Sequence, residues 1–293
     1  MTQNNSFQRR KWKFKIDNQI IITSIICYKA ILANPGRKIN AMKFNTEEYL
    51  HRINYSGNIE PNLNTLRKLQ KAHLLHVPFE NLDIHHNIPI NLSIERIFDK
   101  VVNQNRGGFC YELNGLFYEL LVALGFDAIR VSARVYDQNK GYGKEFDHFA
   151  IIVTIDNTSY LTDVGFGEFT FEPLRIELGT IQNDERGNYL IDNYENGYFR
   201  VNKVENNRLT PEYIFSETAR IFADFEEMCT YHQTSPESHF THKRLITRPT
   251  ENGRITISGN TLKIKEFQSV EEFVLKNETA FEKELWNKFK IKI

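Results

Sequence analysis

The spacing of apolar residues changes along the chain and predicts three parts. Apolar positions recur every three or four residues over 63–74 and 94–102, which indicates amphipathic helices up to about residue 126. Short β-branched and aromatic runs bounded by turn residues then predict a strand-rich middle, with strands near 129–135, 148–153, 160–163 and 198–204. The end is mixed: residues 254–264 predict a hairpin on a Gly-Asn turn, and residues 271–289 predict a closing amphipathic helix.

The first 41 residues do not share this pattern. A basic stretch over 9–15 precedes an apolar run over 20–28, an order that imitates a secretory signal. The run ends after nine residues, which is too short to span a bilayer. A clearer start follows Met42, where Asn45 can cap a helix with Glu48 at its third position. We expect residues 1–41 to be an unstructured, dispensable extension, with a cleaved or anchoring segment as the alternative.

Composition favours a soluble, cytoplasmic enzyme. The chain has 293 residues, of which 41% are hydrophobic and 25% charged, and its formal net charge is zero. This balance argues against a nucleic-acid partner, and no membrane partner is expected. Three cysteines are too few and odd in number for a disulfide framework, so a reducing compartment is expected.

A single thiol, Cys110, follows two glycines in the segment RGGFCYELN at 106–114. Glycine lets the backbone turn sharply and approach a ligand closely. Apolar residues at helical spacing follow as far as Leu124, and Gly125 is a typical stop, so Cys110 is predicted at a helix N-terminus. Because the positive end of a helix lowers a thiol pKa, Cys110 is a candidate nucleophile.

Such a nucleophile needs a base and a group that orients the base. His148 opens the apolar run HFAIIV, and Asp163 follows a second short strand and precedes the loop VGFG. The residues at 156–159 favour a turn, so the two strands are predicted to form an antiparallel hairpin. That pairing would place His148 and Asp163 opposite one another at the same end of the ladder.

Five segments occur together in this chain. They are the nucleophile segment, HFA at 148–150, TDVGFG at 162–167, PFENLD at 78–83 and YHQTSPESHF at 231–240. Over about residues 42–290, this set and its order resemble the arylamine N-acetyltransferase family. The resemblance implies an α+β fold with a helical bundle (42–126), a central β-barrel-like domain (127–235) and an α/β lid (236–293) around a papain-like Cys-His-Asp core.

The resemblance also implies a reaction. Cys110, His148 and Asp163 would form the catalytic triad of an acyltransferase that acetylates arylamines and arylhydrazines, with acetyl-CoA as co-substrate. Acetyl would pass through Cys110 in a ping-pong mechanism, and such enzymes act in xenobiotic metabolism. The same triad also serves other thiol acyltransferases, amide synthases and cysteine hydrolases, which remain alternatives.

Binding residues are less clearly marked. No Walker or Rossmann glycine loop is present, so CoA is expected to meet scattered side chains and loop amides. The resemblance implies Tyr231 and Ser238 as cofactor contacts, beside an unexpected carboxylate at Glu237, and Phe79 and Phe166 as aromatic walls for the arylamine. The histidines near residues 73–86 lack the ligand spacing of a metal site, so no metal is expected.

Overall fold

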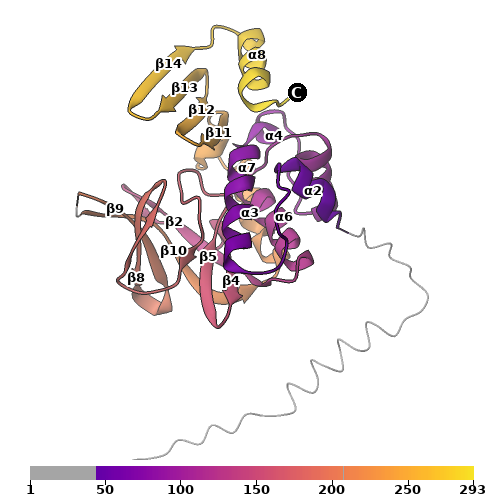
Figure 1. Cartoon of the computed structure of the whole chain (residues 1–293). Coiled ribbons are helices and arrows are strands. Elements are labelled where there is room, and N and C mark those ends of the chain that lie inside the picture. Colours follow the sequence, from indigo (N-terminus) through magenta and orange to yellow (C-terminus); the bar gives the residue numbers. More distant parts are fainter. Residues whose placement is uncertain (1–43, 207) are drawn as a thin grey trace, which may run out of the picture. The chain divides into compact units, whose positions relative to one another are not determined.

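The computed structural model describes residues 44–206 and 208–293, so the predicted extension over residues 1–41 lies outside the described residues. The first helix begins where the sequence predicts, because the Asn45 side chain accepts a hydrogen bond from the Glu48 N–H. The helical elements up to residue 123 are α2 (Thr46–Arg52), α3 (Leu63–His76), α4 (Leu82–His85), α5 (Ile94–Phe98), the π-helical turn η1 (Asp99–Asn103) and α6 (Cys110–Ala123). Helix α6 packs against strands β4 and β2 of the sheet that follows (Figure 1).

The middle of the chain forms an antiparallel, barrel-like sheet in the order β6-β5-β4-β2-β10-β9-β8-β7, with β3 paired to β2. Five of its strands are absent from the sequence prediction: the short strands β3, β6 and β7, strand β8 inside a polar segment, and strand β10 around Pro211, a residue that usually argues against a central strand. The strands are β2 (Asp127–Asp137), β3 (Gly141–Tyr142), β4 (His148–Ile155), β5 (Thr158–Thr162), β6 (Leu174–Arg175), β7 (Ile181–Asp184), β8 (Gly187–Asn193), β9 (Phe199–Glu205) and β10 (Arg208–Arg220).

A second sheet has the order β1-β11-β12-β13-β14. Its first strand belongs to the otherwise helical part of the chain, and its β12–β13 pair is the hairpin predicted over residues 254–264. The strands are β1 (Phe79–Glu80), β11 (Leu245–Thr250), β12 (Gly253–Ser258), β13 (Thr261–Glu266) and β14 (Ser269–Val274). The remaining helices of the described residues are η2 (Glu195–Gly197), η3 (Phe222–Phe225), α7 (Glu226–Thr234), η4 (His239–Thr241) and α8 (Glu278–Phe289).

The helix predicted over residues 271–289 is wrong in its first part. Residues 269–274 form strand β14, which pairs along its whole length with β13. The helix begins only at Glu278, because the Asn277 side chain caps it by accepting from the Ala280 N–H at 2.9 Å. Long-range pairing therefore overrides the helical spacing of the apolar residues before Asn277.

Strand β4 separates two hydrophobic cores because both of its faces are apolar. Phe149 and Ile151 pack in the core that contains the helices, whereas Ala150 and Ile152 pack in the core of the barrel-like sheet. A third core lies between the second sheet and α8. His148, the first residue of β4, therefore lies at the end of the strand that the two larger cores share.

Candidate active site

Helix α6 begins at Cys110, so the predicted position of this thiol at a helix N-terminus is confirmed. The glycines before it lie against strand β1: the Gly108 N–H donates to the Pro78 carbonyl at 3.2 Å, and the Glu80 N–H donates to the Gly108 carbonyl at 2.9 Å. A Cβ at Gly107 would come within 2.2 Å of the Pro78 oxygen, so only glycine fits there. This close contact fixes where α6 starts.

The electrostatic effect on Cys110 is opposite to the expected one. Burial raises the pKa of the Cys110 thiol well above its ordinary value, and Cys229 and Asp163 act in the same direction. A hydrogen bond from the Tyr111 N–H lowers the pKa without outweighing burial. The expected net lowering by the helix end is therefore wrong, because desolvation penalises the thiolate more than the first turn stabilises it. Cys110 needs a base to ionise.

Asp163 fixes the orientation of the His148 imidazole. His148 Nε2 lies 2.7 Å from Asp163 Oδ2, and both side chains are buried. Asp163 Oδ1 accepts from the N–H groups of Gly165 at 2.9 Å and Phe166 at 3.0 Å. Because an ionised carboxylate only accepts hydrogen bonds, Nε2 carries the proton, and the lone pair of Nδ1 stays available. The imidazole has the tautomer of a general base.

The hairpin of β4 and β5 is present, but its register differs from the prediction. The ladder ends with Ile151 opposite Thr162, so Asp163 follows the last paired residue and His148 lies three residues before its own. The two groups share one end of the hairpin, as expected, but they are not opposite one another. Their contact forms because the chain leaves the ladder after Thr162 and the loop brings the carboxylate to the imidazole.

Asn114 connects this loop to helix α6, a role that sequence reasoning missed. Its Nδ2 donates to Asp163 Oδ1 at 2.9 Å and to the Phe149 carbonyl, and its Oδ1 accepts from the Val164 N–H at 2.9 Å. Asn114 lies four residues after Cys110, so the two side chains share a helix face, and this spacing was the available signal. A polar residue on that buried face needs partners.

Gly165 allows the loop to approach the helix closely. A Cβ at this position would lie 2.7 Å from Asn114 Nδ2 and 2.8 Å from the Cys110 carbonyl oxygen. Any larger residue would push the Asp163 loop away from the turn that carries the thiol. The loop and the helix therefore hold Cys110 and Asp163 in one fixed arrangement.

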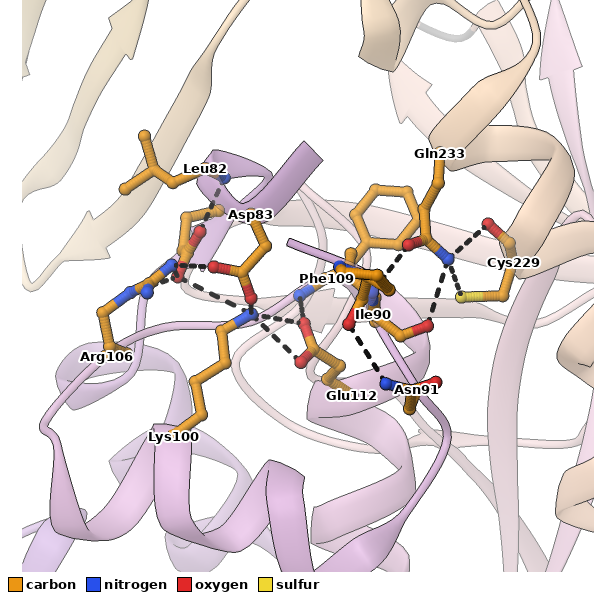
Figure 2. Close-up of polar contacts among 12 residues, drawn as sticks. Leu82, Asp83, Ile90, Asn91, Lys100, Arg106, Phe109, Glu112, Cys229 and Gln233 are labelled. Carbon is orange, nitrogen blue, oxygen red and sulfur yellow. Dashed lines mark hydrogen bonds and ion pairs between the residues drawn. The ribbon is translucent and has the colours of Figure 1, made fainter. Parts of the chain in front are cut away.

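A cluster of buried charges lies beside the first turn of α6, and Figure 2 shows Lys100 between Asp83 and Glu112. Lys100 Nζ lies 2.7 Å from Asp83 Oδ2 and 2.8 Å from Glu112 Oε2. Arg106 Nη2 lies 2.8 Å from Asp83 Oδ1 and 2.7 Å from Glu80 Oε1. We call these five residues the charge cluster. All are almost excluded from solvent, so their mutual pairing replaces hydration.

The charge cluster reaches the backbone next to Cys110 through Glu112. This residue is the third of α6, and its Oε2 accepts from the N–H of the N-cap residue Phe109 at 2.8 Å (Figure 2). Burial alone would lower the pKa of Lys100, but Glu112, Glu80 and Asp83 outweigh it and raise this pKa above its ordinary value. The ammonium therefore stays charged and keeps Glu112 in place.

Cys110 and His148 line one cavity of about 730 Å³. The two predicted aromatic wall residues, Phe79 and Phe166, also line it. The Phe166 ring contacts the His148 ring edge to face, with centroids 5.4 Å apart, and Phe79 packs against Phe109 at 5.6 Å. An apolar, aromatic surface therefore adjoins the imidazole.

Tyr231 and Ser238 line the same cavity, but their side chains are not equally available to a ligand. The buried Ser238 hydroxyl donates to the His232 carbonyl at 3.1 Å, so it already has an acceptor. The Tyr231 hydroxyl donates to the Glu237 carboxylate at 3.3 Å, and Lys144 Nζ lies 4.8 Å from the centroid of the Tyr231 ring. Tyr231 therefore presents an aromatic ring and a nearby cation to the cavity.

Three histidines of the helical part, His73, His76 and His85, have hydrogen-bond partners within the protein. His73 Nδ1 lies 2.7 Å from the Tyr49 hydroxyl, and burial lowers the pKa of His73 to about 3. Within residues 44–206 and 208–293, no three His, Cys, Asp or Glu side chains are grouped as metal ligands. Over the same residues, no helix combines the length and apolar character needed to cross a membrane.

Comparisons with known proteins identify the family of this chain. A sequence model of an N-acetyltransferase family matches residues 62–293. Arylamine N-acetyltransferase 1 of Homo sapiens is 33% identical over 272 residues, which cover 84% of this chain and 94% of that protein. The chain belongs to the arylamine N-acetyltransferase family.

Solved structures confirm the α+β fold of this arylamine N-acetyltransferase. The Mycobacterium marinum arylamine N-acetyltransferase in complex with CoA is 32% identical, with a TM-score of 0.78 over 84% of this chain and 93% of that one. A Bacillus cereus arylamine N-acetyltransferase, described as having a Cys-His-Glu triad, is 26% identical, with a TM-score of 0.79 over 86% of this chain and 100% of that one. In the present chain the acid bonded to the histidine is an aspartate, Asp163.

Proposed function

We propose that this chain transfers acetyl from acetyl-CoA to aromatic amines and hydrazines, in two half-reactions that pass through acetylated Cys110. The observation that carries the proposal is the single cavity lined by Cys110 and His148, with the imidazole held by Asp163. The family supports it, since the human relative is named an arylamine N-acetyltransferase and the M. marinum relative binds CoA.

The first half-reaction starts with proton transfer from Cys110 Sγ to His148 Nδ1. The imidazolium forms beside the Asp163 carboxylate, which stabilises its charge. Because burial raises the pKa of the thiol, the thiolate exists only as a partner of this imidazolium. The thiolate attacks the thioester carbonyl, the C–S bond to CoA breaks, and CoA leaves as a thiol with the proton from His148.

In the second half-reaction a neutral amine attacks the carbonyl of acetyl-Cys110. His148 Nδ1 takes a proton from the amine as the N–C bond forms, and returns it to the Cys110 sulfur as the C–S bond breaks. The oxyanion of each tetrahedral intermediate needs N–H donors. The N–H of Cys110 suits this role because the first residues of a helix have no acceptor within it.

The phosphates of acetyl-CoA suit the side of the cavity that carries Lys140 and Lys144. Both lysines line the same cavity as Cys110, and Lys144 lies over the ring of Tyr231. We call Lys140, Lys144 and Tyr231 the basic side. Ammonium groups bind phosphates, and no glycine-rich loop is needed when such side chains are present. Ser238 would contact the cofactor without donating a hydrogen bond of its own, because its hydroxyl already donates to the His232 carbonyl and its N–H to the Ser235 carbonyl.

The acceptor is expected to be aromatic for two reasons. Phe79 and Phe166 give the cavity apolar surfaces that favour a flat ring. An arylamine is also unprotonated near neutral pH, whereas an alkylamine, like the lysine side chain, is protonated and cannot attack.

Mass spectrometry of the enzyme incubated with acetyl-CoA alone tests the intermediate. We expect one acetyl group on Cys110, which disappears when an arylamine is added. Cys110→Ser should form no adduct and show no turnover, because the serine hydroxyl is not ionised in this arrangement. Cys229→Ala is the matched control: it removes another buried cysteine, and it should retain both the acetyl adduct and turnover. Turnover by Cys110→Ser at a rate near that of the wild type would refute the proposal.

Steady-state kinetics test the order of the half-reactions. Because CoA leaves before the amine attacks, double-reciprocal plots against either substrate should give parallel lines. Intersecting lines would exclude this scheme. A preference for alkylamines, or cleavage of peptides, would instead indicate another thiol acyltransferase or a cysteine hydrolase.

A further inference from the structure

Strand β10 contains a bulge at Glu212. Along the β9–β10 ladder Pro211 faces Asn202 and Tyr213 faces Val201, so Glu212 is an extra residue with no partner on β9. A β-bulge breaks the alternation of side chains and redirects the extra one. At this position the redirected side chain is a carboxylate that lines the cavity of Cys110 and His148.

Glu212 is next to the residue that supports the catalytic histidine. The ring of Tyr213 packs against the rings of His148 and Phe166, with centroids 5.6 Å and 5.2 Å apart. Glu212 therefore lines the cavity from the same strand whose next residue packs against the imidazole and Phe166. A ligand ring that rests against Phe166 would lie close to this strand.

The Glu212 carboxylate has no partner of its own in the described part of the chain. Among residues 44–206 and 208–293, no hydrogen bond or close ion pair reaches it, and Lys203 and Glu168 act on it only through charge. Lys203, which also lines the cavity, is paired with Glu205 at 2.8 Å. A half-buried carboxylate without a partner gains more from a cationic ligand than a paired one does.

Glu168 adds a second carboxylate to the same wall. It follows the Asp163 loop, lines the cavity and raises the pKa of Glu212, which shows that the two charges act on each other. The only close cation of Glu168 among the described residues is Arg186, whose Nη2 lies 3.9 Å from Glu168 Oε1. The Glu168 side chain is 56% exposed. We call Glu168 and Glu212 the acceptor wall.

The cavity lining carries charges of both signs, since Asp137, Asp147, Glu237 and Lys203 line it as well. The ammonium groups of Lys140 and Lys144 suit the phosphates of acetyl-CoA, whereas the carboxylates of Glu168 and Glu212 would repel them. Because CoA has left before the amine binds, the amine meets the acceptor wall without CoA beside it. The charge of the acceptor wall then selects among amines.

We propose that Glu212, assisted by Glu168, determines acceptor specificity, and that it favours aromatic amines or hydrazines with a cationic substituent over those with a carboxylate. This inference rests on the proposed function and names the substrate class of its second half-reaction. A cationic substituent would pair with Glu212, whereas a carboxylate would bring like charges together in a partly desolvated space.

The titration of Glu212 adds a pH dependence to the selectivity. Burial, Glu168 and Glu205 raise its pKa to about 7, against the opposing effect of Lys203. Among the described residues, the hydroxyl groups of Tyr189 on strand β8 and Tyr213 on strand β10 also feel its charge. Glu212 is therefore neutral well below pH 7 and negative well above it. Preference for the cationic acceptor should increase as pH rises from 6 to 8.

Two acceptors with a common 4-aminobenzoyl core test the inference. One is 4-aminobenzoate, and the other is the 4-aminobenzamide that carries a 2-(diethylamino)ethyl chain on its amide nitrogen. The readout is the ratio of their kcat/KM values on one enzyme preparation, so loss of folded enzyme or slower acetylation of Cys110 cancels. The wild type should favour the cationic amine at least about tenfold at pH 8, equivalent to about 1.4 kcal/mol.

Glu212→Gln should lower this ratio about fivefold or more and remove its increase between pH 6 and pH 8. Glu217→Gln is the matched control, since it neutralises an exposed glutamate of the same strand that does not line the cavity, and it should match the wild type. A ratio within twofold of wild type in Glu212→Gln, with Cys110 still acetylated, overturns this inference alone. A wild type that acetylates neither amine, and forms no acetyl-Cys110, overturns the proposed function and this inference with it.

Discussion

The charge cluster beside α6 excludes its carboxylates from water, and the acceptor wall half-buries the carboxylate of Glu212, but the two regions treat these buried charges differently. In the charge cluster each carboxylate lies within 3.0 Å of Lys100 or Arg106. In the acceptor wall Glu212 has no such partner among the described residues. A paired charge is already satisfied and fixes the backbone around it, whereas an unpaired one still gains by binding a ligand. The charge cluster therefore positions the backbone, whereas the acceptor wall is suited to recognise a ligand.

The largest effect is expected at Asp163, the most fully bonded carboxylate of the site. Asp163→Asn keeps the shape of the side chain but can present an N–H to His148, so the imidazole adopts the wrong tautomer. We expect kcat to fall by about four orders of magnitude, by analogy with the same change in a serine protease triad. The thermal midpoint should stay close to that of the wild type. A loss of less than tenfold in kcat would mean that the bonded carboxylate is only structural.

The charge cluster should be sensitive to loss of its cation. Lys100→Met leaves the carboxylates of Asp83 and Glu112 buried with less compensation, so we expect a cost of about 4 kcal/mol in the free energy of unfolding. Lys263→Met breaks a surface pair with Glu272 whose side chains are about half exposed, and should cost less than about 1 kcal/mol. Chemical denaturation measures both. Equal costs would remove the distinction between buried and exposed pairs on which the positioning role depends.

Removing the charge of Glu212 from the acceptor wall should stabilise the protein, whereas removing a charge from the charge cluster destabilises it. The pKa of Glu212 is raised to about 7 in the folded chain, so the folded state disfavours the ionised carboxylate. Stability is lost as pH rises from the ordinary glutamate pKa toward 7 and stays lost above it. Glu212→Gln should therefore stabilise the protein at pH 8, by about 2 kcal/mol after allowance for partial exposure, and much less at pH 5. Destabilisation at pH 8 would mean that Glu212 has a partner in the fold.

The parts of the site that local patterns determine could be predicted from the sequence. The apolar spacing after Cys110 and the stop at Gly125 place the thiol at a helix start, and the apolar run after His148 predicts a strand buried on both faces. The parts that depend on distant contacts could not. Lys100 and Glu112 meet because a π-helical turn and α6 pack together, and β14 is a strand only because β13 lies beside it.

The direction of the Cys110 pKa shift also could not be predicted from the sequence. A helix start predicts a lowered thiol pKa, but the sequence does not report how deeply that start is buried, and burial decides the direction. Glu212 was missed for a related reason. Pro211 hides strand β10, and a bulge depends on the register between two strands that must first be known.

The bulge in β10 also determines which part of this enzyme can change without damage. Glu212 is outside the β9–β10 ladder, so a different side chain there alters no backbone pairing, while Tyr213 keeps its place opposite Val135 and against His148. Substrate preference and acetyl transfer can therefore diverge independently in descendants of this chain. A library randomised at position 212 alone would explore new acceptors on an unaltered catalytic framework.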